Sequence, residues 1–185
     1  MKSVQLLQLG LNINPGLRNT EIIHMAQLAA RLGFSEIYLP EGQYDPQFVS
    51  ELEGVVEASR VVLHPREKVY TVLSSANLDG VRRLSEVLKK DSLGSGVILD
   101  VNVFIGRTLN EAMARAERDA RFTIAELQES GLFGTFEQVQ GRIIELASAG
   151  VEQLIATVPY ELDVADVLAQ MRALVVGPAV KLGNS

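Results

Sequence analysis

Apolar positions along this chain alternate between two spacings. Short, dense apolar runs predict buried strands, and runs with apolar residues at every third or fourth position predict amphipathic helices. The predicted strands span residues 4–13, 35–40, 60–64, 68–73, 97–106 and 153–158. The predicted helices span residues 20–32, 46–59, 78–90, 110–129, 135–148 and 164–176. Because parallel strands joined by helices need right-handed crossovers with helices on the sheet faces, the pattern predicts an α/β fold.

The second half of the pattern bears on topology. Residues 97–106, VILDVNVFIG, form the longest apolar and β-branched run, which predicts a central strand. Helices at 110–129 and 135–148 are expected to follow it with no strand between them. Thr135 and Gln138 have the spacing of a capping box, which predicts the start of the second of these helices.

Composition supports a single domain over residues 1–185, with 47% hydrophobic and 22% charged residues. The chain has no cysteine, which excludes disulfides, thiolate nucleophiles and cysteine-ligated metals. The N-terminal segment lacks the long apolar stretch and the small-residue cleavage site of a signal peptide. No apolar stretch is long enough to span a bilayer, so a cytoplasmic location and no membrane partner are expected.

The formal net charge is −6, which argues against general binding to nucleic acid or to anionic membranes. Arg82, Arg83, Lys89 and Lys90 gather on the helix predicted at 78–90. A plain solvated helix face and a local phosphate contact are the two interpretations of this basic group.

Four segments, in chain order, have the character of one known family. They are MAQLAARLGFSEIYLPEG at 25–42, VYTVLSSANLDGVRRLSEVL at 69–88, VNVFIGRTLNEAMARAERDAR at 101–121 and GTFEQVQGRIIELASAGVEQLIATV at 134–158. Together they resemble luciferase-like monooxygenases, the TIM-barrel flavin and deazaflavin enzymes related to bacterial luciferase. The last segment departs from the family pattern at Phe136, where proline is usual. The alternative is an unrelated strand–helix protein whose helix starts match.

The resemblance implies a shortened barrel. Family members carry further strand–helix units between the second strand and the phosphate turn, where this chain has only residues 42–68. The expected architecture is an incomplete (β/α) TIM-barrel-like fold with about five parallel strands, the first two units joined to the last three. Because barrel interiors are apolar, two open edges and an uncovered inner face predict a homodimer. A monomer with a flattened open sheet is the alternative.

The resemblance also implies a cofactor site. Ser74, Ser75, Asn77 and Gly80 lie in the turn SSANLDG, between a predicted strand and a predicted helix. Free N–H groups and the helix dipole attract phosphate at such a position. By resemblance these residues would hold the phosphate of FMN or a deazaflavin. The alternative is that Asn77 merely caps the helix and the serines are polar turn residues.

No catalytic residue is identified. Family members often carry a histidine soon after the Pro-Glu that ends the second strand, but this chain has Glu41, Gly42 and Gln43. Since glycine and glutamine do not titrate near neutral pH, the resemblance does not extend to luciferase-type acid–base catalysis. His24 is expected at the surface or in helix packing. His64, at the end of a predicted strand, is the alternative candidate for a site.

Glu41 and Asp100 are candidate lone carboxylates, but their spacing predicts no catalytic pair. No metal site is predicted, because no cluster has ligand spacing. A flavin- or deazaflavin-dependent oxidoreductase of the monooxygenase type is one function that fits, with the redox chemistry supplied by the cofactor. A non-catalytic cofactor-binding or structural homodimer is a second, and a subunit that completes a barrel with a longer paralogue is a third.

Overall fold

The structure is a computed structural model that describes residues 4–5, 7–57, 59–63, 72–91, 96–118, 123–161 and 163–177. Its strands are β1 (Val4–Gln5), β2 (Gln8–Asn12), β3 (Glu36–Tyr38), β4 (Arg60–Val62), β5 (Val72–Leu73), β6 (Val97–Gly106), β7 (Leu132–Thr135), β8 (Val151–Thr157) and β9 (Val176–Gly177). Its helices are α1 (Asn19–Arg31), α2 (Pro46–Val55), α3 (Leu78–Lys90), α4 (Leu109–Glu117), α5 (Ile124–Ser130), α6 (Phe136–Ser148) and α7 (Val164–Leu174). His64 and most of the strand predicted at 68–73 lie outside the described residues.

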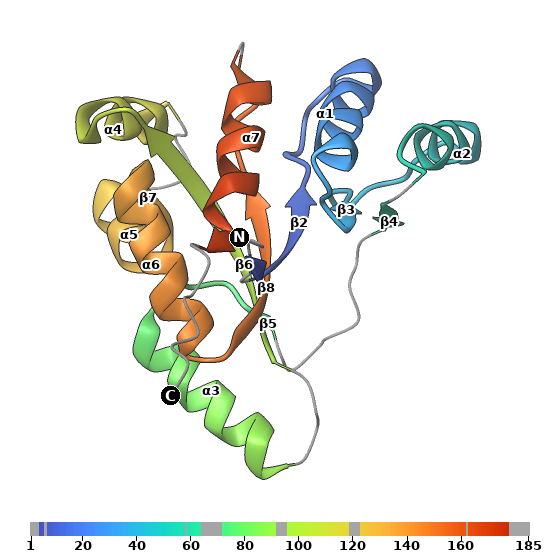
Figure 1. Cartoon of the computed structure of the whole chain (residues 1–185). Coiled ribbons are helices and arrows are strands. Elements are labelled where there is room, and N and C mark those ends of the chain that lie inside the picture. Colours follow the sequence, from blue (N-terminus) through green and yellow to red (C-terminus); the bar gives the residue numbers. More distant parts are fainter. Residues whose placement is uncertain are drawn as a thin grey trace.

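Seven parallel strands form one open sheet (Figure 1). Six follow the order β4-β3-β2-β8-β6-β5, and β7 pairs with β6. The first strand of the sheet, β2, therefore lies beside the last, β8, as in a closed barrel. The sheet does not close, because β4 and β5 stand at opposite ends of the order. The predicted incomplete TIM-barrel-like architecture is confirmed, with short strands raising the strand number above the expected five or so.

The prediction of no strand between the helices at 110–129 and 135–148 is wrong. The segment predicted as one helix at 110–129 forms α4 and α5, and β7 then precedes α6. Because β7 has four residues and includes Gly134, its sequence lacks the β-branched run that marks a strand. The capping box predicted at Thr135 and Gln138 is confirmed at the start of α6.

One face of the sheet, here called the convex face, holds the main core. Helices α1, α2, α3, α6 and α7 cover it, because side chains alternate between the two faces of a strand and the apolar set points to this side. The strand residues of this core include Leu9, Leu11, Ile37, Leu99, Val101, Leu154 and Ala156.

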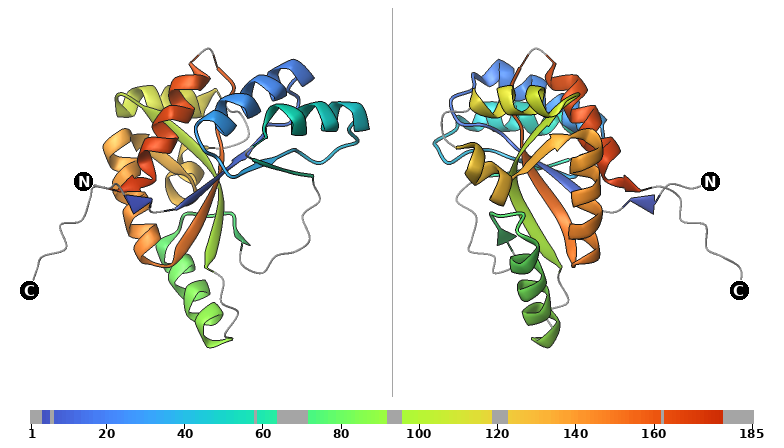
Figure 2. Two further views of the ribbon diagram at one scale, coloured as in Figure 1. Left: turned by 45° about the vertical axis from the view of Figure 1, so that its right-hand side comes forward. Right: turned by 90° about the vertical axis from the view of Figure 1, so that its left-hand side faces the viewer.

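Helices α4 and α5 pack on the opposite, concave face. Phe104 of β6 points there and forms a second core with Ala116 of α4 and Leu127 of α5. In the right-hand view of Figure 2, α5 and α6 lie on opposite sides of β6. The chain runs from β6 to β7 toward the β5 edge of the sheet, opposite to the direction from β2 to β3 and from β7 to β8. Because crossovers between parallel strands are right-handed, a crossover in this reversed direction must pass over the other face of the sheet.

The start of β7 lies directly beyond the end of β5 along the same edge of β6. Leu73 of β5 is opposite Leu99, and Leu132 of β7 is opposite Val103. The N–H of Ala76 donates to the carbonyl oxygen of Ser130, across 2.8 Å, which ties the two segments together. The turn after β5 therefore meets the connection from α5 to β7.

Candidate functional site

The predicted phosphate turn joins β5 to α3 and is held by its own side chains. Asn77 is the N-cap of α3, and its Oδ1 accepts a 3.0 Å hydrogen bond from the N–H of Gly80. The hydroxyl oxygen of Ser75 accepts a 3.3 Å hydrogen bond from the N–H of Asn77. The structure thus brings Ser75, Asn77 and Gly80 together, with Ser74 exposed just before them. The capping role of Asn77 is confirmed, whereas the phosphate contact stays a prediction.

A side chain of α6 hydrogen-bonds to the same turn. The Nη2 of Arg142 donates to the carbonyl oxygen of Ala76 across 2.9 Å, while its Nη1 pairs with Glu145, also at 2.9 Å. Together with the Ala76–Ser130 hydrogen bond, this fixes the backbone of the turn on both its N–H and its carbonyl side.

A groove of about 370 Å³ adjoins the turn. Its lining comes from the start of α4, from α5, from β7 and from the first turns of α6, namely Leu109, Gln128, Gly131, Leu132, Phe133, Gln138, Val139 and Arg142. The groove therefore lies beside the start of β7, between α5 and the first turns of α6, with Leu109 just beyond the carboxyl end of β6. Arg142 links it to the turn, because this side chain both lines the groove and contacts Ala76.

The groove offers three kinds of surface. Leu109 and Phe133 supply apolar area, and Leu109 is exposed. Glutamines provide amide groups, and Arg142 is the one charged residue among those that line the groove. This combination suits a flat, partly apolar ligand with hydrogen-bonding edges and an anionic group.

A second polar arrangement lies on the concave face around Glu36 of β3. Its carboxylate accepts hydrogen bonds from the Tyr38 hydroxyl and from Nε2 of Gln153, the latter at 2.7 Å, and pairs with Arg60 at 2.6 Å. Burial acts to raise the pKa of Glu36, but these hydrogen bonds and the charge of Arg60 outweigh it and lower the pKa. Glu36 is therefore ionised near neutral pH and is not poised as a general base.

Closer to the carboxyl ends, the concave face carries a row of neutral polar side chains. Asn102, Thr157 and Asn12 are opposite one another on β6, β8 and β2. Nδ2 of Asn12 donates to Oγ1 of Thr157 across 3.0 Å. The inner face thus differs from the apolar layer expected by analogy with closed barrels. An open sheet permits polar side chains there, because they can hydrogen-bond to one another and to water.

Of the titratable residues singled out in the sequence, the three that the structure describes, His24, Glu41 and Asp100, do not gather into a catalytic cluster. His24 is exposed on α1, with Nδ1 3.1 Å from the Tyr160 hydroxyl. Glu41 is exposed after β3, and Asp100 is half-buried on the concave face of β6. Among the described residues, no group of three or more histidine, aspartate or glutamate side chains could hold a metal ion.

The basic group of α3 has the geometry of a solvated face. Arg82, Arg83, Lys89 and Lys90 are all exposed. Arg82 pairs with Asp79 at 3.7 Å on the same helix. Such exposed pairs contribute little to stability.

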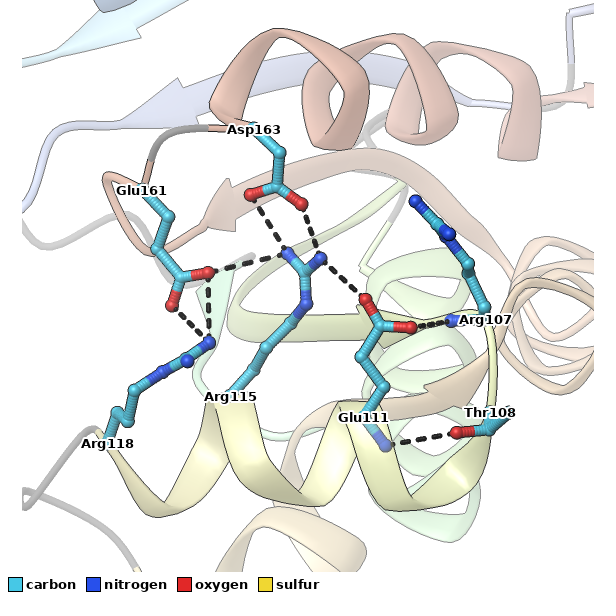
Figure 3. A network of polar contacts seen from close by, with 7 residues as sticks. All are labelled: Arg107, Thr108, Glu111, Arg115, Arg118, Glu161 and Asp163. Carbon is cyan, nitrogen blue, oxygen red and sulfur yellow. Dashed lines mark hydrogen bonds and ion pairs between the residues drawn. The ribbon is translucent and has the colours of Figure 1, made fainter.

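Sequence reasoning missed an ion-pair network at the carboxyl end of the sheet (Figure 3). Arg115 of α4 pairs with Glu111 at 3.0 Å, with Asp163 at 2.5 Å and with Glu161 at 3.6 Å. Arg118 pairs with Glu161 at 2.8 Å. The side chain of Arg115 is 10% exposed. Only the spacing of Glu111 and Arg115 could have been noticed, because the other partners are distant in sequence.

The ion pairs of this network shift the pKa values of Arg115 and Glu111. Burial acts to lower the pKa of Arg115, but hydrogen bonds to Asp163 and Glu111 raise it overall. The hydrogen bond from Arg115 lowers the pKa of Glu111, as does the bond from the N–H of Arg107. Arg115 and Glu111 are therefore charged at neutral pH. No helix within the described parts of the chain is both long and apolar enough to cross a membrane.

Two solved structures share this arrangement of strands and helices. The coenzyme F420-dependent tetrahydromethanopterin reductase from Methanopyrus kandleri has a TM-score of 0.66 and 10% identity, over 91% of this chain and 98% of that chain. Apo-MsnO8 has a TM-score of 0.58 and 14% identity, over 91% and 97%. The fold is luciferase-like. No family model matches the chain, and no curated protein matches it in sequence.

Proposed function

We propose that this protein binds FMN or a deazaflavin in the groove between α5, β7 and the first turns of α6. The phosphate of the cofactor lies at the turn that contains Ser74, Ser75 and Asn77. One observation carries the proposal: the predicted phosphate turn and the groove adjoin, because Arg142 lines the groove and donates to the carbonyl oxygen of Ala76. The luciferase-like fold supports it, since one neighbour of similar fold is named as dependent on coenzyme F420.

The residues present fit a phosphorylated, flat cofactor. The hydroxyls of Ser74 and Ser75 can donate to phosphate, the guanidinium of Arg142 supplies positive charge, and the N-terminus of α3 adds its dipole. Gln128 and Phe133 offer an amide partner and an aromatic face for the ring system. The volume of about 370 Å³ lies within the range of small-molecule sites.

When bound, such a cofactor supplies hydride-transfer or oxygen chemistry, and the chain orients it and shields it from water. Under this proposal the protein is an oxidoreductase of the luciferase-like type. Ser75 and Arg142 bind the anionic end, and the apolar wall that includes Leu109 and Phe133 excludes water from the ring.

A non-catalytic cofactor-binding protein is the second candidate. It is favoured by the lining of the groove, because none of the residues there is a histidine, aspartate or glutamate that could exchange a proton with a substrate. In this case the cofactor binds at the same place, but no side chain of the groove supports proton transfer.

Titration of the purified chain with FMN and with coenzyme F420 tests the proposal. Flavin or deazaflavin fluorescence reports binding, and a rise in the melting temperature reports that the ligand prefers the folded chain. A ligand that prefers the native state stabilises it, by about 2.7 kcal/mol at a concentration of 100 Kd. If both ligands at saturating concentration leave fluorescence and melting temperature unchanged, the proposal is wrong. Turnover with NAD(P)H or with reduced coenzyme F420 separates the oxidoreductase from the non-catalytic binder.

A further inference from the structure

The connections that follow β6 and β8 leave the sheet toward opposite faces. These strands are neighbours, with Asn102 opposite Thr157. The chain after β6 enters α4 on the concave face, where Ala116 joins the second core. The chain after β8 enters α7 on the convex face, where Leu168 joins the main core. Such a divergence opens a crevice at the carboxyl ends of an α/β sheet, and ligands commonly bind there.

In this chain Arg115 bridges the divergence. Its guanidinium comes from α4, while Glu161 and Asp163 come from the connection between β8 and α7 (Figure 3). The side chain of Arg115 is nine-tenths buried, while the carboxylate side chains are 24–40% exposed, so solvent screens these pairs only in part. Removing the guanidinium takes the shared cation from three carboxylates and leaves α4 without its link to the β8–α7 connection, which is unfavourable.

Helix α4 connects this bridge to the groove. The helix is short, and its first residue, Leu109, forms part of the groove wall. The helix also lies directly on its strand, since a Cβ added at Gly106 would be 2.4 Å from the backbone nitrogen of Ala112. A rigid helix fixed at Arg115 therefore fixes the position of Leu109.

We propose that Arg115 is a positioning residue: it ties α4 to the β8–α7 connection and so sets the wall of the groove without touching the ligand. The effect on ligand affinity rests on the proposed function. The effect on the two tied segments does not, because it is measurable in the protein without cofactor.

The experiment replaces Arg115 with methionine, which keeps much of the length and removes the charge. Arg118→Met is the matched control, because Arg118 is exposed and pairs only with Glu161 among the described residues. In amide hydrogen exchange, residues 109–117 and 158–161 of Arg115→Met exchange about tenfold faster than in the wild type, while α1 and α2 keep their rates. The control stays within about twofold of the wild type.

Ligand binding provides the second readout. The Kd for FMN rises about tenfold in Arg115→Met, and Arg115→Lys, which keeps the positive charge, recovers part of the loss. Wild-type exchange rates in both segments of a folded Arg115→Met protein would overturn the positioning role. Faster exchange in both segments together with an unchanged Kd for FMN would also overturn it, since the groove wall would then be independent of the bridge.

If Arg115→Met does not fold, Asp163→Asn replaces it, because Asp163 makes no side-chain cap hydrogen bond to α7 and its loss leaves the start of that helix intact. The same exchange pattern is expected, and wild-type rates would overturn the role. If the wild-type chain binds neither FMN nor coenzyme F420, the proposed function fails, while the exchange rates still decide whether Arg115 positions α4.

Discussion

The guanidinium of Arg142 donates a 2.9 Å hydrogen bond to the carbonyl oxygen of Ala76. This bond joins α6 to the turn that precedes α3, two elements that are far apart in the sequence. Because Arg142 also lines the groove, the turn and the groove are parts of one local structure.

Replacing Arg142 with methionine should weaken cofactor binding. The variant loses both the hydrogen bond to Ala76 and the cation beside the proposed phosphate position. A hydrogen bond to a charged group contributes about 1.5–3 kcal/mol, which corresponds to a Kd raised by about tenfold or more. Fluorescence titration with FMN measures the change. Lys89→Met, on the exposed face of α3, is the control and should bind like the wild type. Equal affinities in the two variants would contradict the proposed position of the phosphate.

Replacing Glu36 with glutamine should destabilise the sheet at neutral pH. Glutamine cannot accept the hydrogen bonds of Tyr38 and Gln153 and pair with Arg60 as the carboxylate does. We expect a loss of about 1–3 kcal/mol in the free energy of unfolding, measured by urea denaturation. Glu53→Gln, on the exposed face of α2, should change it by less than about 0.5 kcal/mol.

The pH dependence of stability should also identify Glu36. Its pKa is lowered in the folded chain, since hydrogen bonds from Tyr38 and Gln153 and the charge of Arg60 outweigh the opposing effect of burial. Its contribution is therefore present above the ordinary glutamate pKa, about 4.3, and is lost as the pH falls through the lower folded value. The free energy of unfolding should fall more steeply below about pH 5 in the wild type than in Glu36→Gln. Parallel curves would show that Glu36 makes no such contribution.

Two glycine substitutions should have opposite effects. A Cβ at Gly106 would lie 2.4 Å from the nitrogen of Ala112 and 2.7 Å from the carbonyl oxygen of Thr108, so Gly106→Ala must displace α4. We expect Gly106→Ala to lower the free energy of unfolding by about 1–3 kcal/mol. Gly141 is helical, and no atom beyond the adjacent backbone of its own helix lies within 4 Å of its added Cβ, so Gly141→Ala should stabilise α6 by about 0.5–1 kcal/mol. Thermal unfolding measures both, and a harmless Gly106→Ala would contradict the close seating of α4.

A homodimer remains our prediction for the assembly. An apolar inner face does not support it, because the concave face carries Asn12, Asn102 and Thr157 toward the carboxyl ends of the strands. The open edges of the sheet still support it, since an edge strand can pair with another chain. Light scattering should give twice the chain mass, and a monomer mass at high protein concentration would contradict the prediction.

Long periodic segments were predictable from the sequence. The strand at 97–106 and the helix at 78–90 have the bounds that the pattern predicted. Both are long enough for their apolar period to outweigh local exceptions. The sequence also indicates the polar concave face, because Asp100 and Asn102 alternate with leucine and valines in the longest strand. A central strand with such an alternation has one apolar face and one face that tolerates polar side chains.

Features that depend on distant residues could not be predicted. Arg115 meets Asp163 only because the reversed crossover carries α4 to the concave face, and that reversal depends on the short strand β7. The groove beside Arg142 depends on the same strand, since Phe133 lines it. The sequence therefore located the turn at 74–77 but not the pocket next to it.

The most direct test of the account is amide hydrogen exchange of the whole chain with and without saturating FMN, repeated with coenzyme F420. We predict that at least one ligand slows exchange at residues 74–80 and 128–142, while α1 and α2 are unchanged. Binding with no protection of these two segments, or protection of the concave strands alone, would contradict the account, as would the absence of binding by both ligands.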